Sequence, residues 1–214
     1  NFIDVGNNWA ELNEPQDIAR FILGSKAQTL SRLAPMVKKS KIGKQISFTV
    51  EEWISNSDDI ILQIQQIFSG KQLIIRSSAS QEDGWSNSLA GKYTSILNVD
   101  SGSTESIIKV VKEVVSSYGD NTNNSDDQVL VQELLNDINI SGVVLTCKLE
   151  TGAPYYIFNF QDDEGSIEGI TSGTSQDDRT IVLHNKEVAQ LKKVEPKLEP
   201  VRNAIDELKD LLSF

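Results

Sequence analysis

The sequence predicts an α+β protein built in two parts, and three observations carry this prediction. Helical patterns alternate with short strand patterns over the first 120 residues. The segment 119–127 is rich in Asn, Asp and Ser, a composition that favours a linker between subdomains. Beyond it, short apolar runs separated by glycines predict successive strands before a final helix. We therefore expect one subdomain over 1–120 and another over 128–214, meeting near residue 125.

The first part is expected to contain helices and strands in alternation. Apolar residues at three- and four-residue spacing over 15–36 predict two short helices, with Ser25 as the N-cap of the second. Thr49 and Glu52 have the spacing of a capping box, so another helix should begin near residue 50. The other expected elements are strands over 46–50, 73–75 and 93–99, a helix from Ser57 and a helix over 103–115.

The second part is expected to be mainly strands followed by one helix. The apolar face of that helix runs from Leu198 to Leu212, and Pro200 is compatible with its first turn. Cys147 lies in an apolar-rich run, which predicts a buried side chain. The expected strands cover 129–131, 142–146, 155–158 and 180–183.

The composition argues against a disordered, nucleic-acid-binding, membrane-spanning or secreted protein. A hydrophobic content of 38% with 24% charged residues is typical of a soluble globular domain and argues against disorder. The net charge of −11 argues against nucleic acid as the main partner. No run approaches the roughly 20 apolar residues that a membrane helix requires, and no secretory signal pattern opens the chain. With a single cysteine, these features favour a cytoplasmic protein.

The segment Gly24-Ser25-Lys26-Ala27 stands at the head of an expected helix. A helix N-terminus presents N–H groups and a partial positive charge, so an adjacent lysine makes an anion site. A solvent-exposed helix lysine explains Lys26 as well, and the glycine spacing of a P-loop is absent. The segment alone leaves both interpretations open.

Arg76 follows the expected buried strand over 73–75 and precedes a run of small residues that ends near Gly91. The planar guanidinium fork suits a pair of phosphate oxygens, and small residues let a backbone approach a ligand closely. The alternative is a structural salt bridge with Glu82 or Asp83. The residue types alone do not decide between a phosphate contact and this salt bridge.

Gln132 lies at the end of the expected strand over 129–131, ten residues before Gly142. A strand that leads through a polar residue into a linker can offer backbone and amide groups to an adenine edge. Taken alone, the pattern favours an ordinary strand with an exposed glutamine.

Several other chemistries do not fit the sequence. His184 is the sole histidine, and with one cysteine in the chain it cannot build a zinc site. It also lacks the G-x-S-x-G context of a hydrolase triad, so a structural or surface role is expected. The clustered carboxylates are interpreted as solvated turns: Asp162, Asp163, Glu164, Asp177 and Asp178.

The order of the three segments resembles a known family. The series Arg76-Ser77-Ser78-Ala79, Glu82-Asp83, Ala90-Gly91 and Leu97-Asn98-Val99 is similar to V-R-S-S-A-x-x-E-D…F-A-G-Q…L-N-V. That signature belongs to the ATP-binding domain of phosphoenolpyruvate synthase, pyruvate phosphate dikinase and rifampicin phosphotransferase. Residues 24–30 are similar to its G-G-K-x-x-x-L, and residues 131–146 to its V-Q-x-M…S-G-V-x-F-T. Order and spacing agree over roughly 22–150, with Ser25 and Lys92 as departures.

The resemblance implies an ATP-grasp-like fold of two α/β subdomains with mostly antiparallel sheets, truncated at the C-terminal end. It implies that Lys26 and Arg76 hold the phosphates of ATP. Gly91 and Ser95 would bring a loop against the nucleotide, and Gln132 would lie by the adenine. No catalytic residue is assigned. The Mg²⁺ ligands of the family follow a helix like that over 197–212 and are expected beyond the end of this chain.

The function that the resemblance implies is the ATP-binding fragment of a phosphotransferase. The parent would transfer phosphate from ATP to a histidine, and then to pyruvate or another acceptor such as an antibiotic or a glucan. Its phosphohistidine and pyruvate-binding domains would be the partners of this chain. The start at Asn1 and the end at Phe214 are interpreted as those of an excised fragment, which alone should bind ATP weakly at best and turn over nothing. The alternative is a non-catalytic nucleotide-sensing or protein-interaction module on the same fold.

Overall fold

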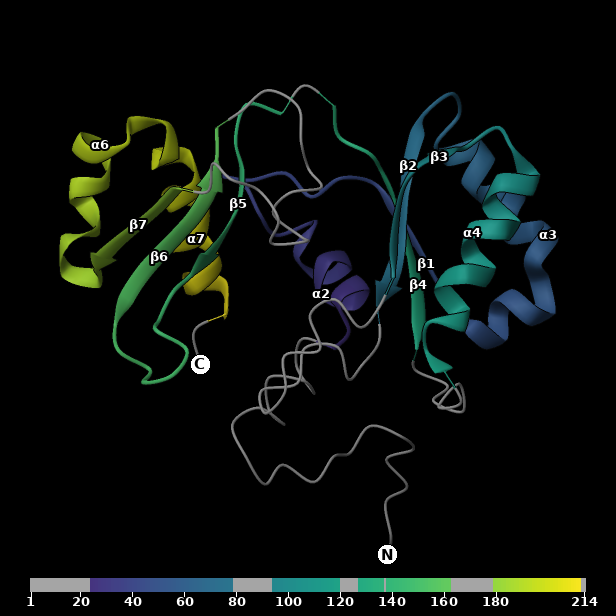
Figure 1. Cartoon of the computed structure of the whole chain (residues 1–214), viewed down its shortest axis with the longest axis horizontal. Helices are drawn as coiled ribbons and strands as arrows, with labels where there is room; N and C mark the ends of the chain where they lie inside the picture. Colours follow the sequence, from purple (N-terminus) through teal and green to yellow (C-terminus); the bar gives the residue numbers. More distant parts are fainter. Residues whose placement is uncertain (1–23, 79–93, 120–126, 137, 163–178, 213–214) are drawn as a thin grey trace, which may run out of the picture. The chain divides into compact units, whose positions relative to one another are not determined.

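The computed structural model describes residues 24–78, 94–119, 127–136, 138–162 and 179–212. They form two compact units (Figure 1). The first unit comprises Asn1–Met36 and Ile42–Leu134, and the second comprises Val37–Lys41 and Leu135–Phe214. Each unit has its own antiparallel sheet, so the predicted α+β class is confirmed.

The first unit is built on a four-stranded sheet in the order β1-β4-β2-β3, in which every neighbouring pair is antiparallel. The described residues contain the second of the two helices predicted over 15–36 and the three predicted strands, with boundaries that differ by a few residues, and the helices predicted near residue 50 and from Ser57 are one helix. The first helix predicted over 15–36 lies outside the described residues. The elements of the first unit are α2 (Lys26–Leu33), β1 (Gln45–Thr49), α3 (Val50–Ile67), β2 (Gln72–Ser78), β3 (Ser95–Asp100), α4 (Thr104–Ser116) and β4 (Gln128–Glu133).

The helix start predicted near residue 50 is confirmed by its hydrogen bonds. The Thr49 hydroxyl accepts from the Glu52 N–H at 3.1 Å, and the Glu52 carboxylate accepts from the Thr49 N–H at 2.7 Å. This reciprocal capping box satisfies backbone donors that the first turn of a helix leaves unpaired. The backbone of Asn56 is non-helical inside α3, so the helix is kinked where a second helix was expected to start at Ser57.

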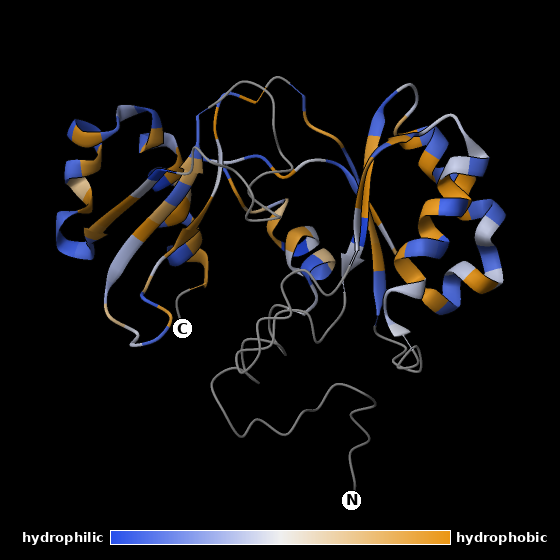
Figure 2. Cartoon of the chain, viewed as in Figure 1, coloured by the Kyte–Doolittle hydropathy of each residue, from blue (hydrophilic) through white to orange (hydrophobic). Residues whose placement is uncertain are grey.

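One face of the first sheet is covered by α3 and α4. Leu73 and Ile75 of β2 and Val129 and Val131 of β4 are fully buried against apolar residues of these two helices (Figure 2). Side chains alternate between the two faces of a strand. The intervening residues of β2 and β4 therefore lie on the opposite face.

The second unit is built on a three-stranded antiparallel sheet in the order β5-β6-β7, followed by helices. Its core contains Tyr156, Phe158 and Phe160 of the central strand together with Leu191 and Leu198. Gly142 is required by close packing, because a Cβ there would lie 2.3 Å from the carbonyl oxygen of Asn159. The elements are β5 (Ser141–Leu145), β6 (Tyr155–Gln161), β7 (Arg179–His184), the 3₁₀ helix η2 (Asn185–Gln190), α6 (Leu191–Val194), the 3₁₀ turn η3 (Pro196–Leu198) and α7 (Glu199–Leu212).

The short segment Val37–Lys41 lies in the second unit although it connects two elements of the first. The carboxylate of Glu207 in α7 explains this assignment. Its two oxygens accept from the backbone N–H groups of Lys38 and Lys39 at 2.8 and 2.9 Å. A single charged side chain thus satisfies two consecutive donors of a segment without secondary structure.

The division into units differs from the predicted boundary near residue 125. The strand expected to open the second part is β4, and it pairs with both β1 and β2 of the first sheet. The first unit therefore extends to Leu134. The expected linker over 119–127 lies largely outside the described residues.

Three side-chain expectations can be compared with the structure. Cys147 follows β5 and is half-buried rather than buried. His184 has the expected structural role, because its Nδ1 accepts from the Lys186 N–H at 3.2 Å and caps η2. Asp162 is not a simple turn residue: one of its oxygens lies 3.1 Å from both Arg179 and Lys197.

The part of the chain that the structure describes contains no helix with the length and apolar composition needed to cross a bilayer.

Candidate functional site

Arg76 lies on the face of the first sheet opposite α3 and α4. The neighbouring residues Ile75 and Ser77 point toward the helices or the buried interior, so the alternation of the strand puts Arg76 on the other side. We call this side the α2 face, because α2 is hydrogen-bonded to it (Figure 1).

The strand register brings two more of the predicted residues to the α2 face. Ser95 of β3 is the direct cross-strand partner of Arg76. Leu130 of β4 is its partner on the other side, which makes Gln132 the diagonal neighbour. Direct partners in a sheet lie about 5 Å apart and diagonal ones about 7–8 Å apart. Arg76, Ser95 and Gln132 therefore form one polar group on a single rigid surface.

One hydrogen-bond donor of the Arg76 guanidinium, the Nε atom, is unpaired among the described residues. This atom is buried, although the residue as a whole is only half-buried. An unpaired buried donor costs free energy, so such groups in native proteins point to a missing partner. The alternative salt-bridge partners, Glu82 and Asp83, lie outside the described residues, as does Gly91.

Lys26 is the first residue of α2, and the helix start places it at the α2 face. Ser25 is the N-cap as predicted, and its side chain forms a capping box with Gln28. Gly24, at φ +74°, begins this turn with a backbone conformation that favours glycine. The N–H of Ala27, next to Lys26, donates to the hydroxyl of Ser78 at 2.9 Å. Since Ser78 is two residues beyond Arg76 on β2, the backbone of Lys26 lies within a few ångströms of the Arg76 strand.

The structure corrects one part of the predicted anion site. The sequence suggested that the first turn of α2 offers free N–H groups to an anion. In the structure the N–H of Ala27 is bound by Ser78, and the N–H of Gln28 is bound by Ser25. These donors fix the helix in place, so an anion contact from this segment falls to the side chain of Lys26.

Sequence reasoning missed the residues that hold α2 on the sheet. They are Gln45 of β1, Ser78 of β2 and Gln128 of β4. Ser78 was noted as part of the arginine motif but was given no role. The alternation of the strand was the available signal, because it predicts that Arg76 and Ser78 share a face while Ser77 points away.

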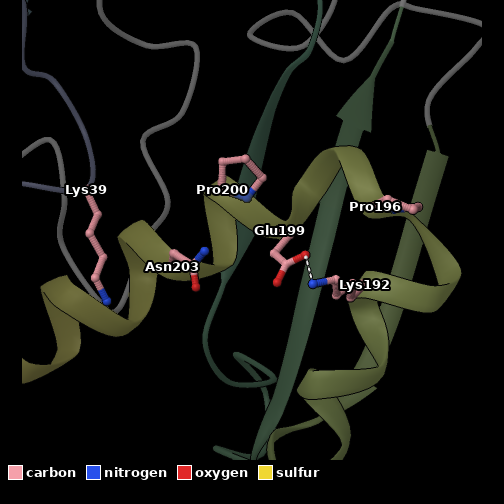
Figure 3. A pocket seen from close by; sticks show the side chains of 6 residues that line it. All are labelled: Lys39, Lys192, Pro196, Glu199, Pro200 and Asn203. Carbon is pink, nitrogen blue, oxygen red and sulfur yellow. Dashed lines mark ion pairs between the residues drawn. The ribbon is translucent and has the colours of Figure 1, made fainter.

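A separate hollow lies in the second unit, beside the first turns of α7 (Figure 3). It is lined by Lys39, Lys192, Pro196, Glu199, Pro200 and Asn203. The Lys192 ammonium lies 3.5 Å from the Glu199 carboxylate. Among the described residues that were predicted to contact a nucleotide, Lys26, Arg76, Ser95 and Gln132 do not line this hollow.

The chain is an α+β protein with two antiparallel sheets. Its candidate site is a cluster of Arg76, Ser95 and Gln132 on the first sheet, beside the helix that carries Lys26. Residues 11–204 match the model of the pyruvate phosphate dikinase AMP/ATP-binding domain. The chain belongs to this family, and the predicted resemblance is confirmed.

A curated relative is the prodigiosin synthesizing transferase PigC of Serratia marcescens, which is 30% identical over 125 residues. The match covers 55% of this chain and 14% of that relative. The chain thus corresponds to a small part of the longer protein.

Proposed function

We propose that the α2 face of the first unit is the forward half of an ATP site in a phosphotransferase of the pyruvate phosphate dikinase family. The observation that carries the proposal is the placement of Arg76, Ser95 and Gln132 as cross-strand and diagonal neighbours. A phosphate oxygen would supply the acceptor that the buried Nε of Arg76 lacks among the described residues. The family match, which is to an AMP/ATP-binding domain, supports a nucleotide as the ligand.

Each residue has a role that its chemistry suits. Arg76 contacts two phosphate oxygens with its planar fork, and Lys26 adds a point charge from the start of α2. Ser95, exposed at the start of β3, and Gly91 bring the preceding loop against the nucleotide. Gln132, near the end of β4, offers its amide to the adenine edge.

Mg²⁺ is expected to accompany ATP, because it bridges the phosphates and neutralises charge in phosphoryl transfer. The described residues contain no group of three or more His, Cys, Asp or Glu side chains that would hold a metal. In the family that the chain resembles, the Mg²⁺ ligands follow a helix like α7, and on that ground we propose that a corresponding segment of the parent enzyme supplies them.

In the proposed parent enzyme, ATP phosphorylates a histidine of another domain, which passes the phosphoryl group to pyruvate or a different acceptor. The similarity to a relative named as a transferase supports this class of reaction. This chain supplies nucleotide binding and orientation, and it is expected to bind ATP weakly and to show no turnover alone.

Replacing Gln132 with alanine tests the adenine contact. We expect about three- to tenfold weaker binding of Mg–ATP, since a neutral hydrogen bond contributes roughly 0.5–1.5 kcal/mol. Binding of inorganic tripolyphosphate, which lacks the base, should not change. Both affinities can be obtained by competition against fluorescent trinitrophenyl-ATP.

Gln65→Ala is the matched control for this substitution. Gln65 lies on α3, on the other side of the sheet, where its amide donates to Thr104 and Gly102. The control should bind both ligands as the unmodified chain does. Equal losses for ATP and tripolyphosphate in Gln132→Ala would contradict an adenine contact.

A further inference from the structure

The first turn of α2 is bound by side chains from three different strands. The hydroxyl of Ser78 in β2 accepts from the Ala27 N–H at 2.9 Å. The side-chain amide of Gln45 in β1 donates to the Ala27 carbonyl at 2.8 Å. The hydroxyl of Ser25 donates to the side-chain oxygen of Gln128 in β4 at 2.8 Å. Both backbone groups of Ala27 are therefore hydrogen-bonded to side chains of the sheet.

The contact between Ala27 and Ser78 is buried, and the contacts made by Gln45 and Gln128 are partly buried. Ala27 and Ser78 are 0% exposed, and Ser25 is 6% exposed. Buried hydrogen bonds are directional and costly to leave unmade, so each contact restricts where the helix start can lie. The small side chains of Ala27 and Ser78 permit this close approach of helix backbone to strand.

The contacts connect the two proposed phosphate-binding residues. Lys26 directly precedes Ala27, and Arg76 lies two residues before Ser78 on the same face of β2. Tyr118 fixes Ser78 in turn, because its hydroxyl accepts from the Ser78 N–H at 3.2 Å and donates to the Gln128 carbonyl at 2.5 Å. A displacement of α2 would move Lys26 relative to Arg76.

We propose that Ser78, with Gln45 and Gln128, positions Lys26 against the phosphate groups that Arg76 contacts. In the motif Arg76-Ser77-Ser78 the first residue binds the ligand, the second packs into the interior, and the third holds the lysine helix. The inference rests on the proposed ATP site and adds to it a set of positioning residues that do not touch the nucleotide.

A double-mutant cycle between Ser78→Ala and Lys26→Ala tests this inference on the full chain. Dissociation constants for trinitrophenyl-ATP in the presence of Mg²⁺ are measured for the four proteins. We expect Lys26→Ala to weaken binding at least tenfold and Ser78→Ala to weaken it about fivefold. The double variant should bind as Lys26→Ala does, because Ser78 acts through Lys26.

Ser77→Ala is the matched control. Ser77 is the neighbouring serine, 1% exposed, and it lies on the opposite face of β2. This control should leave the dissociation constant unchanged. Amide hydrogen exchange gives a second readout: Ser78→Ala should accelerate exchange over Lys26–Leu33 without affecting Val50–Ile67.

The outcomes separate the inference from the proposed function. If Lys26→Ala binds as the unmodified chain does, the phosphate role of Lys26 is wrong, and the inference with it. A second outcome is that Lys26→Ala weakens binding and Ser78→Ala weakens it by the same factor in the double variant as in the single variant. In that case the proposed ATP site stands and the positioning role of Ser78 is refuted. Should Ser78→Ala fail to fold by circular dichroism, the same cycle with the half-buried Gln45→Leu decides between these results.

Discussion

Replacing Arg76 with methionine is expected to weaken Mg–ATP binding by roughly 100-fold or more while leaving the fold at least as stable as before. The loss of affinity follows from two charge-assisted hydrogen bonds to phosphate, each contributing about 1.5–3 kcal/mol. Arg76→Lys keeps the charge but not the planar fork, so it should recover only part of this loss. Trinitrophenyl-ATP titrations of the three proteins measure the effect.

The stability of Arg76→Met separates the two interpretations of this residue. The buried Nε of Arg76 has no partner among the described residues, so removing it should leave the free energy of unfolding unchanged or slightly raised. A structural salt bridge with Glu82 or Asp83 instead predicts a loss of about 1 kcal/mol or more. Thermal unfolding of the variant without ligand therefore decides whether Arg76 serves the ligand or the fold.

Replacing Phe158 with alanine is expected to unfold the second unit in preference to the first. Phe158 is 0% exposed in the central strand β6, and its removal should cost about 3–5 kcal/mol through lost burial and the cavity left behind. The core clusters of the two units share no residue. Hydrogen exchange should therefore accelerate in β5, β6 and β7 while the first sheet keeps its protection.

Val182→Ala is the control for Phe158→Ala. Val182 lies on the neighbouring strand β7 but is 54% exposed, so its truncation should change stability by less than about 0.5 kcal/mol. Simultaneous loss of protection in both sheets of Phe158→Ala would show that the two units unfold as one and would contradict their independence.

Local features of the fold were predictable from sequence because their causes are local. The capping boxes at Ser25 and Thr49 depend on residues three positions apart. The strands of the second unit follow from short apolar runs between turns. The order β1-β4-β2-β3 was not predictable in this way, because it depends on pairing between strands that are far apart in the sequence. Because β4 pairs with strands of the first sheet, the first unit ends at Leu134 and not near residue 125 as predicted.

The residues of the candidate site that lie in recognisable sequence motifs were predictable from the sequence. Lys26, Arg76 and Gln132 stood in segments with recognisable patterns, and the structure places Arg76 and Gln132 on one face. The partners of Ala27 were missed, because Ser78 lies 51 positions away in the sequence and Gln45 lies 18 positions away. The prediction of free N–H groups at the start of α2 failed because the sheet supplies the acceptor for the Ala27 N–H, and the N-cap Ser25 supplies the acceptor for the Gln28 N–H.

Amide chemical shifts of the ¹⁵N-labelled chain during titration with Mg–ATP test whether ATP binds the α2 face of the first sheet. This measurement detects weak binding and locates it. We expect shift changes at Lys26–Gln28, Arg76–Ser78, Ser95 and Leu130–Gln132, with little change along the outer surfaces of α3 and α4. Changes confined to the second unit or to those outer surfaces, or none at millimolar ATP, would contradict ATP binding at this face.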